Sequence, residues 1–240
     1  MNNSRLLAAI RFRCQDSANA LAVYLGIMLL VYAAMVGMLH GIFDHDQTQI
    51  SGGSEFSIVI MFFVLGIVCI REDLRHFSQY GLTRRSVFLC DLTAHTLAAI
   101  VGCLLNSLLL QGVVLLAGGS IVTLTSLFTL PVFSLWYVSA GCSIVLCLCM
   151  AMLGQMISLL YYRLSKRDSL LLTFGGGALL LVGLPWLISR LVLLEPLRKA
   201  CAMFISWLFA APLHFIASFL LLGLLFAALS WLLIRRAPVK

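Results

Sequence analysis

Long apolar runs, each able to cross a lipid bilayer, constrain the fold of this chain more than any other feature of its sequence. A helix that spans the hydrocarbon core needs about 20 consecutive apolar residues. We place six such spans near residues 20–43, 53–70, 86–117, 131–162, 169–188 and 213–234. The chain is 62% hydrophobic and 10% charged, whereas soluble domains are about 25% charged. We therefore predict an all-α, polytopic membrane protein.

Basic residues set the predicted orientation of these spans. Six spans place both termini on the same side of the membrane. Thirteen of the sixteen Lys and Arg residues lie in the segments on that side, 1–19, 71–91, 163–168 and 235–240. Because basic residues accumulate in cytoplasmic loops, both termini are expected in the cytoplasm. The net charge of +7 therefore indicates contact with membrane lipids and no nucleic-acid partner.

The layout divides the chain into a cytoplasmic amphipathic helix over 1–19, a six-helix transmembrane domain over 20–234 and a cytoplasmic tail over 235–240. Arg5, Arg11 and Arg13 lie among apolar residues spaced three and four apart. Such a pattern is typical of a helix that lies in the plane of the membrane surface. We expect this helix to precede the first span as a separate element.

The last apolar run, residues 200–234, is too long for a single span. Pro212 interrupts it, and a proline inside a helix kinks or ends it. We predict a short helix over 200–211 that dips into the outer leaflet, followed by the last span. A single tilted and kinked helix is the alternative.

A polar segment, residues 71–88, separates the second and third spans. Gly81 is expected to end one helix, because glycine adopts the left-handed conformation at little cost. Thr83 is expected to cap the next helix. Arg84 and Arg85 then fall in the first turn, where the helix dipole disfavours cations. Lipid phosphates, or acidic or carbonyl groups of a partner protein, are the two sources that we expect to offset this cost.

Four residues of the third span, Asp91, His95, Gly102 and Asn106, lie within about 60° of one another on a helical wheel. Ionisable groups inside a membrane usually face a bundle interior or water, so this stripe is not expected to face lipid. It lines either a substrate path or a subunit interface, or it is a packing seam of small residues with Asp91 near the cytoplasmic headgroups. Glu55 is expected at the outer end of the second span, within reach of water.

No motif predicts chemistry in this chain itself. Gly175, Gly176 and Gly177 are not followed by the Lys-Ser/Thr of a phosphate-binding loop, so we predict no nucleotide site. No catalytic residue and no metal site are predicted. The acidic and histidine residues of the first outer loop are best explained as a solvated loop, and the eight cysteines are best explained as small buried apolar residues.

The polar segment resembles the first cytoplasmic loop of ABC-2-type transporter permeases. The resemblance rests on Phe77-x-x-x-Gly81-x-Thr83-Arg84-Arg85-x-x-Phe88 leading into a long third span. The layout of the chain also agrees with that family in its length, six spans, cytoplasmic termini, amphipathic first helix and interrupted last run. The resemblance implies an ABC-2, type V exporter-like, permease fold with a short cytoplasmic coupling helix.

The resemblance also implies a function, namely the membrane subunit of an ATP-driven exporter in a bacterial inner membrane. Two permease chains, identical or paralogous, would pair with two copies of a separate ATPase. ATP and Mg²⁺ would be bound by that ATPase, so no cofactor is bound directly by this chain. The ATPase-coupling residues implied by the family, within a coupling loop over 71–85, are Arg71, Glu72, Asp73, Arg75, Phe77, Gly81, Thr83, Arg84 and Arg85.

Such permeases often export peptides, antibiotics or lipids. Two alternatives come from other classes of protein. A membrane scaffold or sensor would have the same helices and no transport. An intramembrane enzyme would need a catalytic pair at matching depth, and the sequence offers none.

Overall fold

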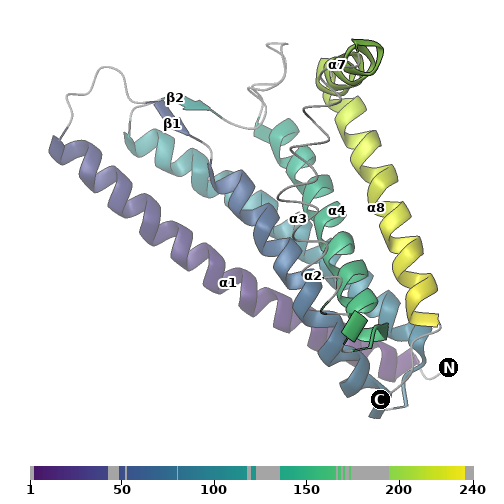
Figure 1. Cartoon of the computed structure of the whole chain (residues 1–240). Helices are drawn as coiled ribbons and strands as arrows, with labels where there is room; N and C mark the ends of the chain where they lie inside the picture. Colours follow the sequence, from purple (N-terminus) through teal and green to yellow (C-terminus); the bar gives the residue numbers. More distant parts are fainter. Residues whose placement is uncertain are drawn as a thin grey trace.

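Helices dominate the computed structural model, which describes residues 3–42, 49–51, 53–79, 81–117, 120–122, 136–165, 167, 168, 170, 173 and 195–235. These residues form the helices α1 (Asn3–Ile42), α2 (Gly53–Gln79), α3 (Arg84–Ala117), α4 (Trp136–Arg163), α7 (Glu195–Ala210) and α8 (Pro212–Arg235). Two short strands, β1 (Gln49–Ser51) and β2 (Ser120–Val122), pair in parallel. Figure 1 shows α2, α3, α4 and α8 as a bundle, with the long α1 running obliquely past it.

Four helical segments are long and apolar enough to cross a membrane: Leu6–Met38, Arg84–Val113, Tyr137–Arg163 and Pro212–Arg235. The chain is therefore a helical, membrane-embedded protein. These segments overlap four of the six predicted spans, and the first begins well before the predicted residue 20. The predicted span over 53–70 corresponds to a shorter apolar stretch, Glu55–Ile70, and the predicted span over 169–188 lies almost entirely outside the described residues.

The start of α1 differs from the sequence prediction. Residues 3–19 do not form a separate helix, because α1 runs without interruption from Asn3 to Ile42. At about 1.5 Å per residue it is roughly 60 Å long, about twice the thickness of the hydrocarbon core. Its N-terminal part packs on the bundle, where Arg13 is only 2% exposed. The basic face that suggested a helix on the membrane surface is therefore partly turned into the protein.

The turn between α2 and α3 has the predicted form. Gly81 has a φ of 71°, which is the left-handed conformation that ends a helix. The N–H of Leu82 donates to the carbonyl of Phe77 at 3.1 Å, and the N–H of Ser86 donates to Thr83 Oγ1 at 3.4 Å. Residues 71–79, however, continue α2 and do not form a separate coupling helix.

The corner between α7 and α8 confirms that residues 200–234 form two helices. α7 ends at Ala210, and Pro212 is the first residue of α8, a position where the missing N–H of proline costs nothing. In Figure 1, α7 is seen nearly end-on at the end of α8, so the two helices meet at a sharp angle. The ring of His214 stacks on that of Trp207 with centroids 4.3 Å apart, which fixes the corner.

The core lies where α2, α3 and α4 meet. Its buried members are Ile58, Val59, Phe62, Ala99, Cys103, Cys147 and Ala151. Two glycines allow α2 and α4 to approach closely, since a Cβ on Gly66 would lie 2.2 Å from the carbonyl oxygen of Ala151, and one on Gly154 would lie 2.4 Å from that of Phe63. Outside the core, α1 and α8 expose large apolar side chains, including Leu30, Met38, Leu221 and Leu224, as helices in contact with lipid do.

Candidate functional site

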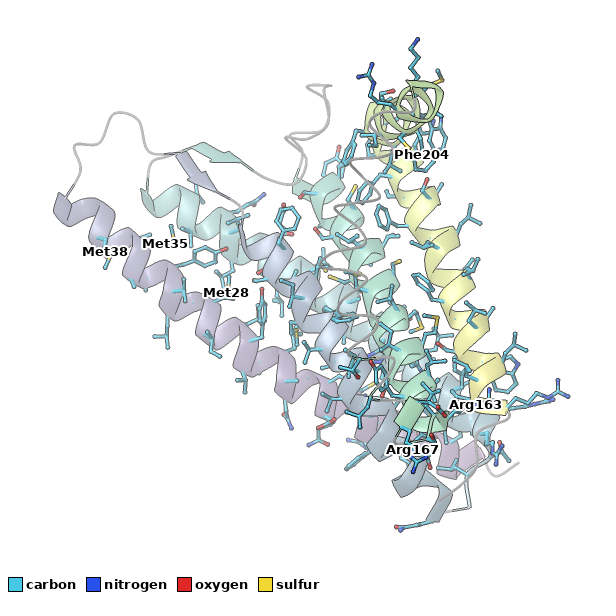
Figure 2. All side chains as sticks on the ribbon, in the orientation of Figure 1. Met28, Met35, Met38, Arg163, Arg167 and Phe204 are labelled. Atoms are coloured by element: carbon cyan, nitrogen blue, oxygen red, sulfur yellow. The ribbon has the colours of Figure 1, made fainter. Side chains whose placement is uncertain are left out.

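The α2–α3 turn lies at the end of the bundle where α1 begins and α8 ends (Figure 1). Arg163 and Arg167 lie at this same end, and Phe204 of α7 lies at the opposite end (Figure 2). We call the former the basic end and the latter the α7 end. The basic end is the one for which the distribution of Lys and Arg predicts a cytoplasmic location.

Phe77 anchors the turn to α1. It is buried in a cluster with Ala9 of α1 and with Val87 and Cys90 of α3. The ring of Phe12 meets the ring of Phe77 edge to face, with centroids 6.4 Å apart. Phe77 was predicted as a coupling residue, and the structure places it as the apolar contact that holds the turn against the first helix.

Arg84 and Arg85 attach the turn to α8. Arg84 Nη1 donates to the carbonyl oxygen of Arg235 at 2.9 Å, and the guanidinium of Arg85 lies 6.0 Å from the ring centroid of Trp231. Phe88 adds a ring contact to Trp231, with centroids 5.5 Å apart. A cation at the C-terminus of a helix is stabilised by the helix dipole. The chain's own α8 therefore gives both cations a favourable contact, its C-terminal carbonyl for Arg84 and the ring of Trp231 for Arg85, and the sequence did not suggest this source.

The remaining predicted coupling residues are Arg71, Glu72, Asp73 and Arg75. Their backbone continues α2 as a helix up to the turn. Their side chains are not among those that the structure describes, so no contact is assigned to them.

Three residues of the predicted stripe on α3, Asp91, His95 and Asn106, are buried. Gly102 has a packing role, because a Cβ there would lie 2.7 Å from Leu21 Cδ1 of α1. The stripe thus faces α1 and the bundle interior, as expected, and not lipid.

Asp91 is 1% exposed and forms an ion pair inside the protein. Arg13 Nε lies 3.1 Å from Asp91 Oδ1, and Arg13 Nη1 lies 2.8 Å from Asp16 Oδ2. Sequence reasoning assigned Arg13 to a surface face and missed this pair. A signal was present, since Arg13 shares a helical face with Ala9 and Ser17, small residues that permit close packing.

Glu55 is the second correction. It was expected within reach of water, yet it is 4% exposed. Ser139 Oγ of α4 donates to its carboxylate. A buried carboxyl group is stable only with such hydrogen bonds, so Glu55 joins α2 to α4 inside the bundle near the α7 end.

The described residues contain no group of three or more His, Cys, Asp or Glu side chains that could hold a metal ion. The sulfur atoms of Cys103 and Cys147 lie 3.6 Å apart across α3 and α4. They belong to the apolar core cluster.

Comparisons with protein-family models, with curated proteins and with solved structures found no match to this chain.

Proposed function

We propose that this chain is the membrane subunit of an ATP-driven exporter of the ABC-2 type. In this proposal it forms half of a translocation path with a second permease chain, and a separate cytoplasmic ATPase drives it. The observation that carries the proposal is the α2–α3 turn, a defined structure at the basic end that is attached to two further helices.

In this proposal, the attachments of the turn to α1 and α8 would transmit its movement to the bundle. Phe77 connects it to α1 through Ala9 and Phe12, and Arg84 connects it to α8 through the carbonyl of Arg235. A displacement of the turn would therefore move four helices, α1, α2, α3 and α8. A turn that served only as a connector between two spans would need neither contact.

ATP hydrolysis would come from the partner, because the sequence lacks a phosphate-binding loop of its own. Two ATPase copies with their Mg²⁺ would face two permease chains in the bacterial inner membrane. A peptide, an antibiotic or a lipid is the cargo class that the family resemblance suggests.

The test is to co-purify the chain with a candidate ATPase and to measure ATP turnover in proteoliposomes. We expect the ATPase to co-purify and its turnover to rise when the permease chain is present. Binding without stimulation would favour a scaffold or sensor. Absence of binding to any ATPase expressed with it would contradict the proposal, as would full activity in a complex with one permease chain.

A further inference from the structure

Three buried polar side chains, one each from α1, α3 and α4, lie at one level of the bundle. They are Ser17, His95 and Gln155, with exposed fractions of 2%, 1% and 1%. Four of their atoms, Ser17 Oγ, His95 Nδ1, Gln155 Oε1 and Gln155 Nε2, have no hydrogen-bond partner among the described residues. A buried polar atom without a hydrogen bond destabilises the fold. The cost is largest inside a membrane, where no water can replace the missing partner.

The register of α3 and α4 places His95 and Gln155 at the same depth. The two helices run in opposite directions, and the sulfur atoms of Cys103 and Cys147 lie 3.6 Å apart. His95 lies eight residues from Cys103 on α3, and Gln155 lies eight residues from Cys147 on α4, both toward the basic end. Each is therefore about 12 Å from the cysteine contact along its helix. Ala99 and Ala151 lie halfway between the cysteines and these two polar residues, and they belong to the same core cluster.

The contact between α1 and α3 adds Ser17 to this level. Both helices begin at the basic end and run in the same direction, and Arg13 pairs with Asp91. Ser17 and His95 each follow four residues later, one helical turn further along. Arg13 is close enough to His95 for the two side chains to interact electrostatically.

We propose that Ser17, His95 and Gln155 form a binding site for a small uncharged hydrogen-bonding group. The core cluster bounds the site toward the α7 end, and the Arg13–Asp91 ion pair bounds it toward the basic end. The two buried charges of that pair neutralise each other, and the second carboxylate on Arg13, that of Asp16, is 60% exposed and therefore screened by water, so an ion in the site would find no buried net countercharge. A hydroxyl group, an amide group or water matches the donors and acceptors that the three side chains offer.

The site does not depend on the exporter proposal, because all its members belong to one bundle. Its ligand is either water or the amide or hydroxyl group of a larger solute. The two sources share the same hydrogen-bonding chemistry, and they are separated by the second measurement below.

The first measurement is the melting temperature of Gln155→Met and Ser17→Ala in lipid nanodiscs, with Leu159→Met as the matched control. Leu159 is buried one turn further along α4, so it reports the cost of a methionine in this bundle. If Gln155 binds a ligand, Gln155→Met should melt roughly 2–4 °C below the control, since about one net hydrogen bond is lost. If the polar atoms bind nothing, replacing them by an apolar group of similar shape is neutral or stabilising. A melting temperature at or above that of the control, for both variants, would overturn the proposal.

The second measurement is hydroxyl-radical footprinting of the wild-type protein in the same nanodiscs, read by mass spectrometry. The radicals are generated by X-ray radiolysis, so a water molecule in the site would yield a hydroxyl radical beside His95, and His95 would be oxidised despite its burial. Oxidation of His95 together with the lowered melting temperature identifies water as the ligand. A lowered melting temperature without oxidation of His95 identifies a co-purified solute, which solvent extraction of the nanodiscs would release.

Discussion

At the scale of single residues, the most consequential feature is the ion pair between Arg13 and Asp91. Burying two charges costs the free energy of their hydration. Their mutual attraction offsets this cost only while they remain paired. The pair joins the first and third helices where they converge at the basic end. The N-terminal part of α1 therefore packs as part of the bundle.

Removing one partner of this pair should be far more harmful than removing both. Asp91→Asn leaves the guanidinium of Arg13 buried without the Asp91 carboxylate, and we expect a loss of about 3 kcal/mol in the free energy of unfolding. Arg13→Met combined with Asp91→Leu should recover most of that loss, because apolar side chains need no countercharge. Denaturant titration in one detergent measures both variants. Equal destabilisation by the single and the double change would show that packing, and not charge, holds the two helices together.

Gly81 gives a second prediction at this scale. Its Cβ position is open, with no atom within 4 Å, so a substitution there acts only through the positive φ of 71°. Gly81→Val should cost about 1–2 kcal/mol, whereas Gly81→Asn, the matched control, should cost less because asparagine tolerates this conformation. We expect Gly81→Val to insert in the membrane and yet to lose stimulation of the ATPase. Wild-type stimulation by Gly81→Val would mean that the turn is only a connector.

At the scale of helices, the sequence predicted boundaries that local chemistry determines and missed those that packing determines. Gly81 ends α2 and Pro212 begins α8 through their own backbone properties, and both boundaries were predicted correctly. The continuity of α1 was missed, although the sequence has no glycine or proline between Asn3 and Leu25. The attachment of Arg84 to α8 joins residues 151 positions apart, a contact that no local pattern reveals.

The geometry of the contact between Arg84 of α3 and Arg235 of α8 predicts which substitutions of Arg84 are tolerated. A single nitrogen, Nη1, donates to a single carbonyl oxygen, so a lysine ammonium can replace it. We expect Arg84→Lys to retain ATPase stimulation and stability. Arg84→Glu should lower the free energy of unfolding by about 1 kcal/mol, because a carboxylate opposes the C-terminal dipole of α8. Unfolding titrations of the two variants side by side provide the measurement, and loss of stability in Arg84→Lys would indicate forked hydrogen bonds to a further partner.

At the scale of the whole molecule, the fold connects the two ends of the bundle through α8. At the basic end α8 is held by Arg84, Arg85 and Phe88 of α3. At the other end the stacked rings of Trp207 and His214 fix its angle to α7. The sequence predicted the class of fold and the common location of both termini from hydropathy and charge. It could not predict the buried polar site, because Ser17, His95 and Gln155 come together only through the register of three helices.

Orientation in the membrane is the last prediction, and the native cysteines make it testable. Six of the eight are buried, Cys14 is half-buried and Cys201 on α7 is exposed. A membrane-impermeant maleimide should label Cys201 in intact spheroplasts, because the excess of basic residues at the opposite end predicts that the opposite end lies in the cytoplasm. Cys201→Ser should remove this label. Adding Arg167→Cys to that variant should restore labelling only after permeabilisation, since residue 167 is exposed at the basic end. Labelling of residue 167 in intact spheroplasts would reverse the orientation and place the α2–α3 turn where no cytoplasmic ATPase can reach it.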